Sequence, residues 1–182
     1  TMNVVFRSIA FILLLCTSFV QAQQPEKIYG KNRVLKPNEY YLQQIELWKV
    51  VIQQHPHDAA AWLNYYRANR NAYIVGEEEE VRDAKGSGRF ARLNSIIQEM
   101  SKKVPASYEY HFAKWLNGNN DSTLFHFLEK AHTLAPREAE PLAQMFLHYE
   151  IRGDTIRRNQ AMREFYALGD YSPGLLNYGY NL

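Results

Sequence analysis

Apolar residues recur at steps of three and four along most of the chain, which is the period of amphipathic helices. The first such face follows Pro37, with Asn38 as the expected N-cap, and ends near His55 and Pro56. A second helix is expected from the cap Asp58 to a stop before Gly76. The pattern predicts further helices over 89–103, 107–116, 122–134, 138–152 and 155–168. No stretch of strict alternation indicates a strand, so the sequence predicts an all-α fold.

Prolines follow several of these helices and mark an approximate period. Pro56, Pro105, Pro136 and Pro173 are separated by 49, 31 and 37 residues. A helix–turn–helix unit of about 34 residues that ends in proline is the signature of tetratricopeptide repeats. The long first interval is explained by an insert over 77–88, which begins with four glutamates. Residues 38–182 therefore resemble a degenerate tetratricopeptide array.

Individual residues support this resemblance when they are counted back from each proline. The family's aromatic, small-residue and terminal-proline positions are matched by Trp62, Ala131, Pro136, Tyr149, Ala161, Phe165 and Pro173. The family's small residue at the tight helix crossing is replaced by Tyr66, Phe112 and Phe146. The resemblance implies stacked antiparallel helix hairpins in a right-handed solenoid, made irregular by these bulky replacements. A strict tetratricopeptide geometry and an irregular helical-hairpin solenoid both remain open.

The first 22 residues have the order of a secretory signal peptide. A short start that carries Arg7 precedes an apolar run of 12 residues, Ile9 to Val20, and Val20-Gln21-Ala22 then places small residues around a cleavage site. We expect cleavage after Ala22 and an extracytoplasmic location, periplasmic or secreted. The run is short of the about 20 apolar residues that a membrane-spanning helix needs. Anchoring in the membrane by an uncleaved signal segment is the alternative. After the signal, residues 23–37 are expected to form a linker or a loosely packed arm.

The single cysteine, Cys16, lies inside the apolar run. A lipoprotein signal requires a small residue before its cysteine, but Leu15 occupies that position. Cleavage after Ala22 is therefore favoured over lipid attachment. The chain that remains would hold no cysteine, which excludes disulfides, thiol catalysis and thiolate metal sites. The remainder carries 20 basic and 19 acidic residues because the first 22 residues contribute only Arg7. This near balance disfavours nucleic-acid binding, which depends on an excess of cations.

A search for chemistry finds no catalytic or cofactor motif. The six histidines lack the spacing of three or four that places two imidazoles on one helix face for a metal. The acidic run in the insert lacks the alternating oxygen ligands and the turning glycine of a calcium loop. We therefore expect no enzyme activity, no metal and no cofactor. An all-α hydrolase with an unrecognised site is a minor alternative.

The expected function is a non-catalytic protein-binding or assembly scaffold. In tetratricopeptide-like arrays the first helix of each pair lines an inner groove. Carried over by position, that groove includes Leu63, Arg67, Arg70, Asn71, Glu109, Leu116 and Leu147. Family members that grip a carboxyl terminus use basic residues and Asn on this face, and Glu109 stands where a second basic group would be needed. Ordinary surface charge is the competing interpretation of these residues, and an accessory helical region of a larger envelope protein or enzyme is the alternative function.

Overall fold

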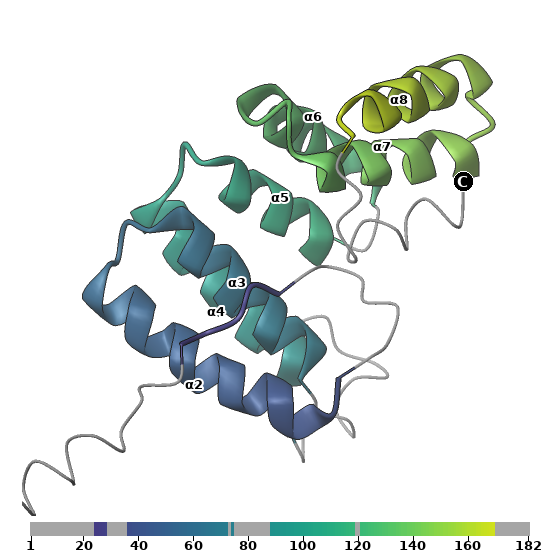
Figure 1. Cartoon of the computed structure of the whole chain (residues 1–182). Helices are drawn as coiled ribbons and strands as arrows, with labels where there is room; N and C mark the ends of the chain where they lie inside the picture. The colour runs from purple at the N-terminus through teal and green to yellow at the C-terminus, as the bar shows by residue number, and fades with distance from the viewer. Residues whose placement is uncertain (1–23, 29–35, 73, 75–87, 119–120, 170–182) are drawn as a thin grey trace, which may run out of the picture.

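The computed structural model describes residues 24–28, 36–72, 74, 88–118 and 121–169 (Figure 1). Within these ranges the chain is all-α, with no strand. The helices are α2 (Asn38–Gln54), α3 (Ala59–Asn71), α4 (Gly88–Lys103), α5 (Tyr108–Asn117), α6 (Phe125–Leu134), α7 (Ala139–Ile151) and α8 (Thr155–Ala167). A 3-10 turn, Ser122–Leu124, precedes α6. The predicted signal peptide, the acidic insert except Gly88, and the end of the chain after 169 lie outside the described residues.

The helix boundaries follow local capping chemistry. The Asp58 carboxylate accepts a hydrogen bond from the Ala61 amide at 3.0 Å, which confirms the predicted cap of α3. Ser107 caps α5 and Asp154 caps α8 in the same way. The prediction that Asn38 caps α2 was wrong. Pro37 occupies the N-cap position, where the φ of −56° imposed by its ring fits an extended N-cap residue, and no side chain caps that helix.

Successive helices pack as neighbours along the chain. The most extensive packing joins α2 with α3, α5 with α6, and α7 with α8, while α4 lies against both α3 and α5 (Figure 1). The helices α3 and α5 also touch directly, and α6 contacts α7. Short connections between apolar helix faces favour this arrangement, because each pair leaves an apolar face that the next helix covers.

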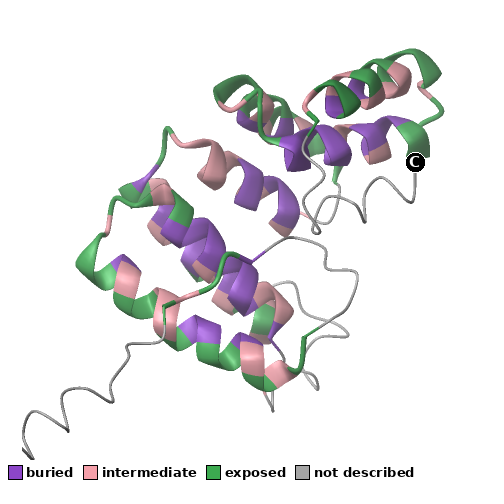
Figure 2. Ribbon diagram, in the orientation of Figure 1, coloured by how far each residue is buried: buried purple, intermediate pink, exposed green. Residues whose placement is uncertain are grey.

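The core is continuous along α3 to α6. Its largest fully buried side chains include Tyr66, Phe112, Met100, Leu128 and Trp115. Figure 2 shows burial concentrated along α3 and α7. Three aromatic residues singled out in the sequence are buried, since Tyr66, Phe112 and Phe146 expose 5% of their surface or less.

An aromatic cluster joins α5, α6 and α7 around His148. The imidazole stacks on Phe125 with ring centroids 3.9 Å apart, and the Trp115 ring lies edge-on to it with a centroid distance of 5.6 Å. Arg152 approaches Nδ1 at 3.1 Å, and since a guanidinium only donates, Nδ1 must accept. Burial, with a smaller contribution from the Arg152 charge, lowers the pKa of His148 from its usual 6.5 to about 4. The imidazole is therefore neutral in the folded protein at neutral pH.

This histidine predicts that stability falls in mild acid. The unfolded chain takes up a proton at His148 as the pH drops through 6.5, whereas the folded chain does so only near 4. The free energy of unfolding is expected to fall between pH 7 and 4, with His148 contributing up to about 3 kcal/mol. Urea unfolding across this pH range measures how steeply the free energy of unfolding depends on pH. This dependence should be weaker in His148→Phe and unchanged in His55→Gln, a substitution at an exposed site. The same pH dependence in both variants would contradict the assignment of this effect to His148.

Candidate functional site

A short extended segment, Gln24 to Ile28, lies across α2 and α3 (Figure 1). We call it the N-terminal segment, and the surface of α2 and α3 beneath it the segment groove. The Ile28 side chain is 2% exposed and packs in one cluster with Tyr41, Ile45, Ala68 and Ala72. Residues 23–37 were expected to be a linker or a loosely packed arm; of the described part, 24–28, Gln24, Glu26 and Lys27 are exposed and Ile28 is buried. One buried isoleucine without periodic neighbours gives no signal that a helical pattern search can detect.

Side chains of the groove bind all four backbone polar groups of Glu26 and Ile28. The Glu26 amide donates to Gln44 Oε1 at 2.8 Å, and its carbonyl accepts from Trp48 Nε1 at 3.1 Å. Two residues on, the Ile28 amide donates to Asn64 Oδ1 at 2.7 Å, and its carbonyl accepts from Arg67 Nη1 at 2.9 Å. Alternate residues of an extended chain face the same side, so the groove contacts the segment at that period. This is the hydrogen bonding of a strand edge, supplied by side chains of two helices.

The groove side chains are themselves held in place. Asn64 Nδ2 donates to the Ala60 carbonyl of its own helix at 2.8 Å, which turns Oδ1 toward the segment. Arg67 is 3% exposed and forms an ion pair with Glu140 of α7 through its second terminal nitrogen. Its guanidinium also lies 5.8 Å from the ring centre of Phe112 on α5. Residues of α3, α5 and α7 therefore fix the donor that holds Ile28.

A polar contact accompanies the segment at its exposed end. The Tyr40 hydroxyl donates to Glu26 Oε2 at 3.0 Å. Burial and the hydrogen bond to Glu26 raise the pKa of Tyr40 to about 12, so the phenol stays protonated and can donate. Lys36 Nζ lies 5.5 Å from the centre of the Tyr40 ring, at the distance of a cation–π contact.

The residues predicted for the binding groove are divided between the interior and two faces. Leu63 and Leu116 are buried in the main core, at 2% and 7% exposure. Arg67 is also buried, but it reaches the segment groove and bonds Ile28. Arg70 and Leu116 line a separate cavity of about 210 Å³ between α3, α4 and α5, with Tyr66, Arg89, Phe90, Leu93 and Asn117.

The remaining predicted residues do not join these sites. Asn71 and Glu109 are half-buried, and burial raises the pKa of the Glu109 carboxyl. Leu147 packs against the α7–α8 clusters. Sequence reasoning missed Gln44, Trp48 and Asn64. Gln44 is a polar residue at a buried position of a helix, and such a residue could have been flagged only with the burial known.

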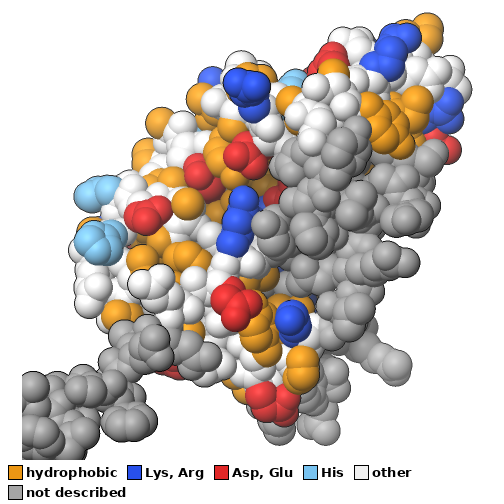
Figure 3. All heavy atoms as spheres, in the orientation of Figure 1, with side chains coloured by type: hydrophobic (Ala, Val, Ile, Leu, Met, Phe, Trp, Pro, Cys, Tyr) orange, Lys and Arg blue, Asp and Glu red, His pale blue; other side chains and the backbone are white. Residues whose placement is uncertain are grey.

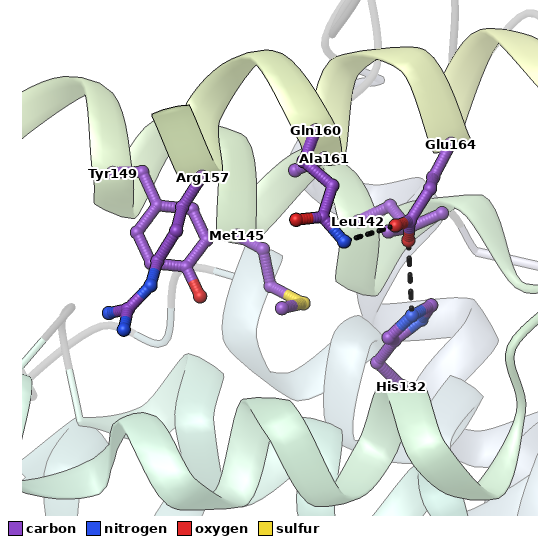
Figure 4. A pocket seen from close by; sticks show the side chains of 8 residues that line it. All are labelled: His132, Leu142, Met145, Tyr149, Arg157, Gln160, Ala161 and Glu164. Carbon is purple, nitrogen blue, oxygen red and sulfur yellow. Dashed lines mark hydrogen bonds and ion pairs between the residues drawn. The ribbon is translucent and has the colours of Figure 1, made fainter. Parts of the chain in front are cut away.

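A second cavity, of about 250 Å³, lies between α6, α7 and α8. Figure 4 shows Glu164 and Gln160 of α8 facing His132 of α6. Glu164 accepts from Gln160 Nε2 at 2.9 Å, and its other oxygen lies 3.6 Å from His132 Nε2. The lining includes no serine, threonine or cysteine, and its hydroxyl is the phenol of Tyr149, whose pKa is raised by burial.

The face of the molecule drawn in Figure 3 is mixed in character. In Figure 3 acidic and basic side chains alternate with hydrophobic ones over the visible face. Within the described ranges, no group of three or more His, Cys, Asp or Glu residues could hold a metal ion. None of the helices described above is both long and apolar enough to cross a membrane. No protein-family model matches the chain, and a search of curated proteins finds no match either.

Proposed function

We propose that this chain is an exported, non-catalytic scaffold that binds extended polypeptide segments of another protein in the segment groove. The observation that carries the proposal is the set of four side-chain hydrogen bonds to the backbone of Glu26 and Ile28. Backbone hydrogen bonds give affinity for any extended chain, and a pocket for an alternate side chain adds selectivity. The Ile28 pocket supplies that second element.

The helix order supports a tetratricopeptide-like, right-handed solenoid as the frame of this scaffold. In that interpretation α3, α5 and α7 are the first helices of successive repeats. Contacts of α3 with α5, and of Arg67 on α3 with Phe112 and Glu140, agree with first helices that line one inner face. The segment groove would then be the amino-terminal end of that face, closed by α2.

Export follows from the signal-like order of residues 1–22. Cleavage after Ala22 would leave Gln23 as the only residue ahead of the N-terminal segment. The groove would then hold the start of the exported chain. The same groove serves the alternative in which these helices are the accessory region of a larger envelope protein.

A peptide array tests the proposal. The probe is the labelled full chain carrying Ile28→Asp, which places a charge in the apolar pocket and frees the groove. The matched probe carries Asn64→Leu in addition, which removes the side-chain oxygen that accepts from the Ile28 amide and leaves the corresponding amide of a bound peptide unpaired. That loss costs about 1–3 kcal/mol, so binding of extended peptides should fall about fivefold or more. The absence of any bound peptide, or the same set bound equally by both probes, would contradict a peptide-binding groove.

A further inference from the structure

We infer that the segment groove selects an extended partner with an acidic residue two positions before an aliphatic one, and that residues 24–28 are a resident competitor for it. This inference rests on the proposed function, because it names the partner of the same groove. The bound segment supplies the pattern, Glu26-Lys27-Ile28. A partner of this chemistry must displace a segment that is already seated.

The aliphatic position is set by a closed pocket. Ile28 is 2% exposed, and the pocket is lined by Ala68 and Ala72, which are themselves at most 2% exposed. Their small side chains allow the segment backbone to approach α3 closely, as the 2.7 Å bond to Asn64 shows. A charged residue there would lose its water without a counter-charge in that apolar cluster. An aliphatic side chain of similar volume fills the pocket without strain.

The acidic position is set by one donor, the Tyr40 hydroxyl. Glu26 accepts from the Tyr40 hydroxyl, and Lys36 lies on the Tyr40 ring. A lysine at this position would leave the Tyr40 hydroxyl without its acceptor. Lys27, between the two recognised residues, is exposed, so the groove places no volume limit on the middle residue.

Tethering explains why the resident segment competes well. Seven residues, 29–35, join it to the stretch that leads into α2. A short tether gives an effective concentration on the order of 1 mM. For a free peptide that binds with a Kd of about 100 µM, the intact chain is therefore expected to bind about tenfold more weakly than a chain whose segment is released.

The experiment measures fluorescence anisotropy with a labelled synthetic peptide of residues 23–32. The wild-type full chain is compared with Ile28→Asp and with the matched control Ile156→Asp, which places the same charge at a site 79% exposed. The peptide should bind Ile28→Asp about tenfold more tightly than it binds the wild type or the control. Peptides with Glu26→Lys or Ile28→Asp should lose at least about tenfold in affinity for the released chain.

A second variant guards against unfolding of Ile28→Asp. Glu26→Pro removes the amide hydrogen that Gln44 accepts and leaves the Ile28 pocket unchanged, so it should release the segment too. Circular dichroism of each variant confirms that the helices are intact.

The outcomes separate this inference from the proposed function. Equal affinity for the wild type and for both released chains overturns the resident competitor. Equal binding of the altered peptides overturns the acidic–aliphatic pattern. In a third outcome, array peptides bind only while Asn64 is present, but the segment peptide does not bind. This result overturns the inference and is consistent with the proposed peptide-binding function of the groove. No binding in either assay overturns both.

Discussion

Glu140→Leu is expected to lower the free energy of unfolding by about 3–5 kcal/mol, because it removes the carboxylate partner of a buried guanidinium. Arg67 is 3% exposed and Glu140 is 8% exposed, so neither group of the ion pair is well solvated. Desolvation of the Arg67 charge is tolerated only while a carboxylate faces it. Urea unfolding of the wild type and of Glu140→Leu measures the difference, provided that the slope against urea is unchanged.

A matched exposed pair provides the control. Arg158 and Glu150 lie 2.8 Å apart with side chains 31% and 49% exposed, so Glu150→Leu should change stability by less than about 1 kcal/mol. The double variant Arg67→Met, Glu140→Leu removes both charges and should recover a large part of the loss. A double variant as unstable as Glu140→Leu would show that packing, and not the unpaired charge, causes the effect.

The same ion pair connects stability to the proposed binding site. Apolar replacements of a buried pair are often as stable as the pair, so stability alone does not require Arg67. An apolar residue could not donate to the Ile28 carbonyl, which Arg67 Nη1 does at 2.9 Å. Glu140 of α7 thereby positions a donor for the segment bound on α2 and α3. We interpret the pair as a positioning device for the groove, and Arg67→Met in the released chain should weaken binding of the segment peptide.

The helices could be predicted because their signals are local. The period of apolar residues and the caps Asp58, Ser107 and Asp154 lie within a few residues of the structure that they determine. Even Asn38, wrong as a cap, marks the first residue of α2. The end of α6 at Leu134, two residues before Pro136, follows from the proline that cannot continue a helix.

The site could not be predicted because its signals are distant in sequence. Arg67 and Glu140 are 73 residues apart, and a basic residue on a helix face gives the same local pattern whether solvent or a carboxylate faces it. The prediction placed Arg67 on a surface for a partner, whereas it is buried against Glu140 and the chain's own Ile28. The N-terminal segment has no helical period, and its burial depends on a groove built by two later helices. Only the three-dimensional arrangement brings these residues together.

Trp115→Ala is expected to lower the free energy of unfolding by about 3–5 kcal/mol, because the side chain fills the junction of three helices. Trp115 of α5 is fully buried and makes edge contacts with Phe125 at 5.9 Å and with His148 at 5.6 Å between ring centroids. Removal of the indole leaves a cavity between α5, α6 and α7 that rigid helices cannot close. The midpoint of urea unfolding should fall accordingly. A loss below about 1 kcal/mol would mean that the helices collapse around the missing ring.

Trp115→Phe separates the packing of this ring from its polar group. The indole N–H of Trp115 is buried and has no hydrogen-bond partner among the described residues. Phenylalanine loses part of the packed surface but also removes that unsatisfied donor, whose burial costs about 1–3 kcal/mol. The two effects oppose each other, so the free energy of unfolding of Trp115→Phe should lie within about 2 kcal/mol of the wild-type value. It should be well above that of Trp115→Ala. Leu134→Ala, at a site 42% exposed, should be close to neutral. If Trp115→Phe were as damaging as Trp115→Ala, the indole nitrogen would have to hold a partner, such as a buried water, that bridges the helices.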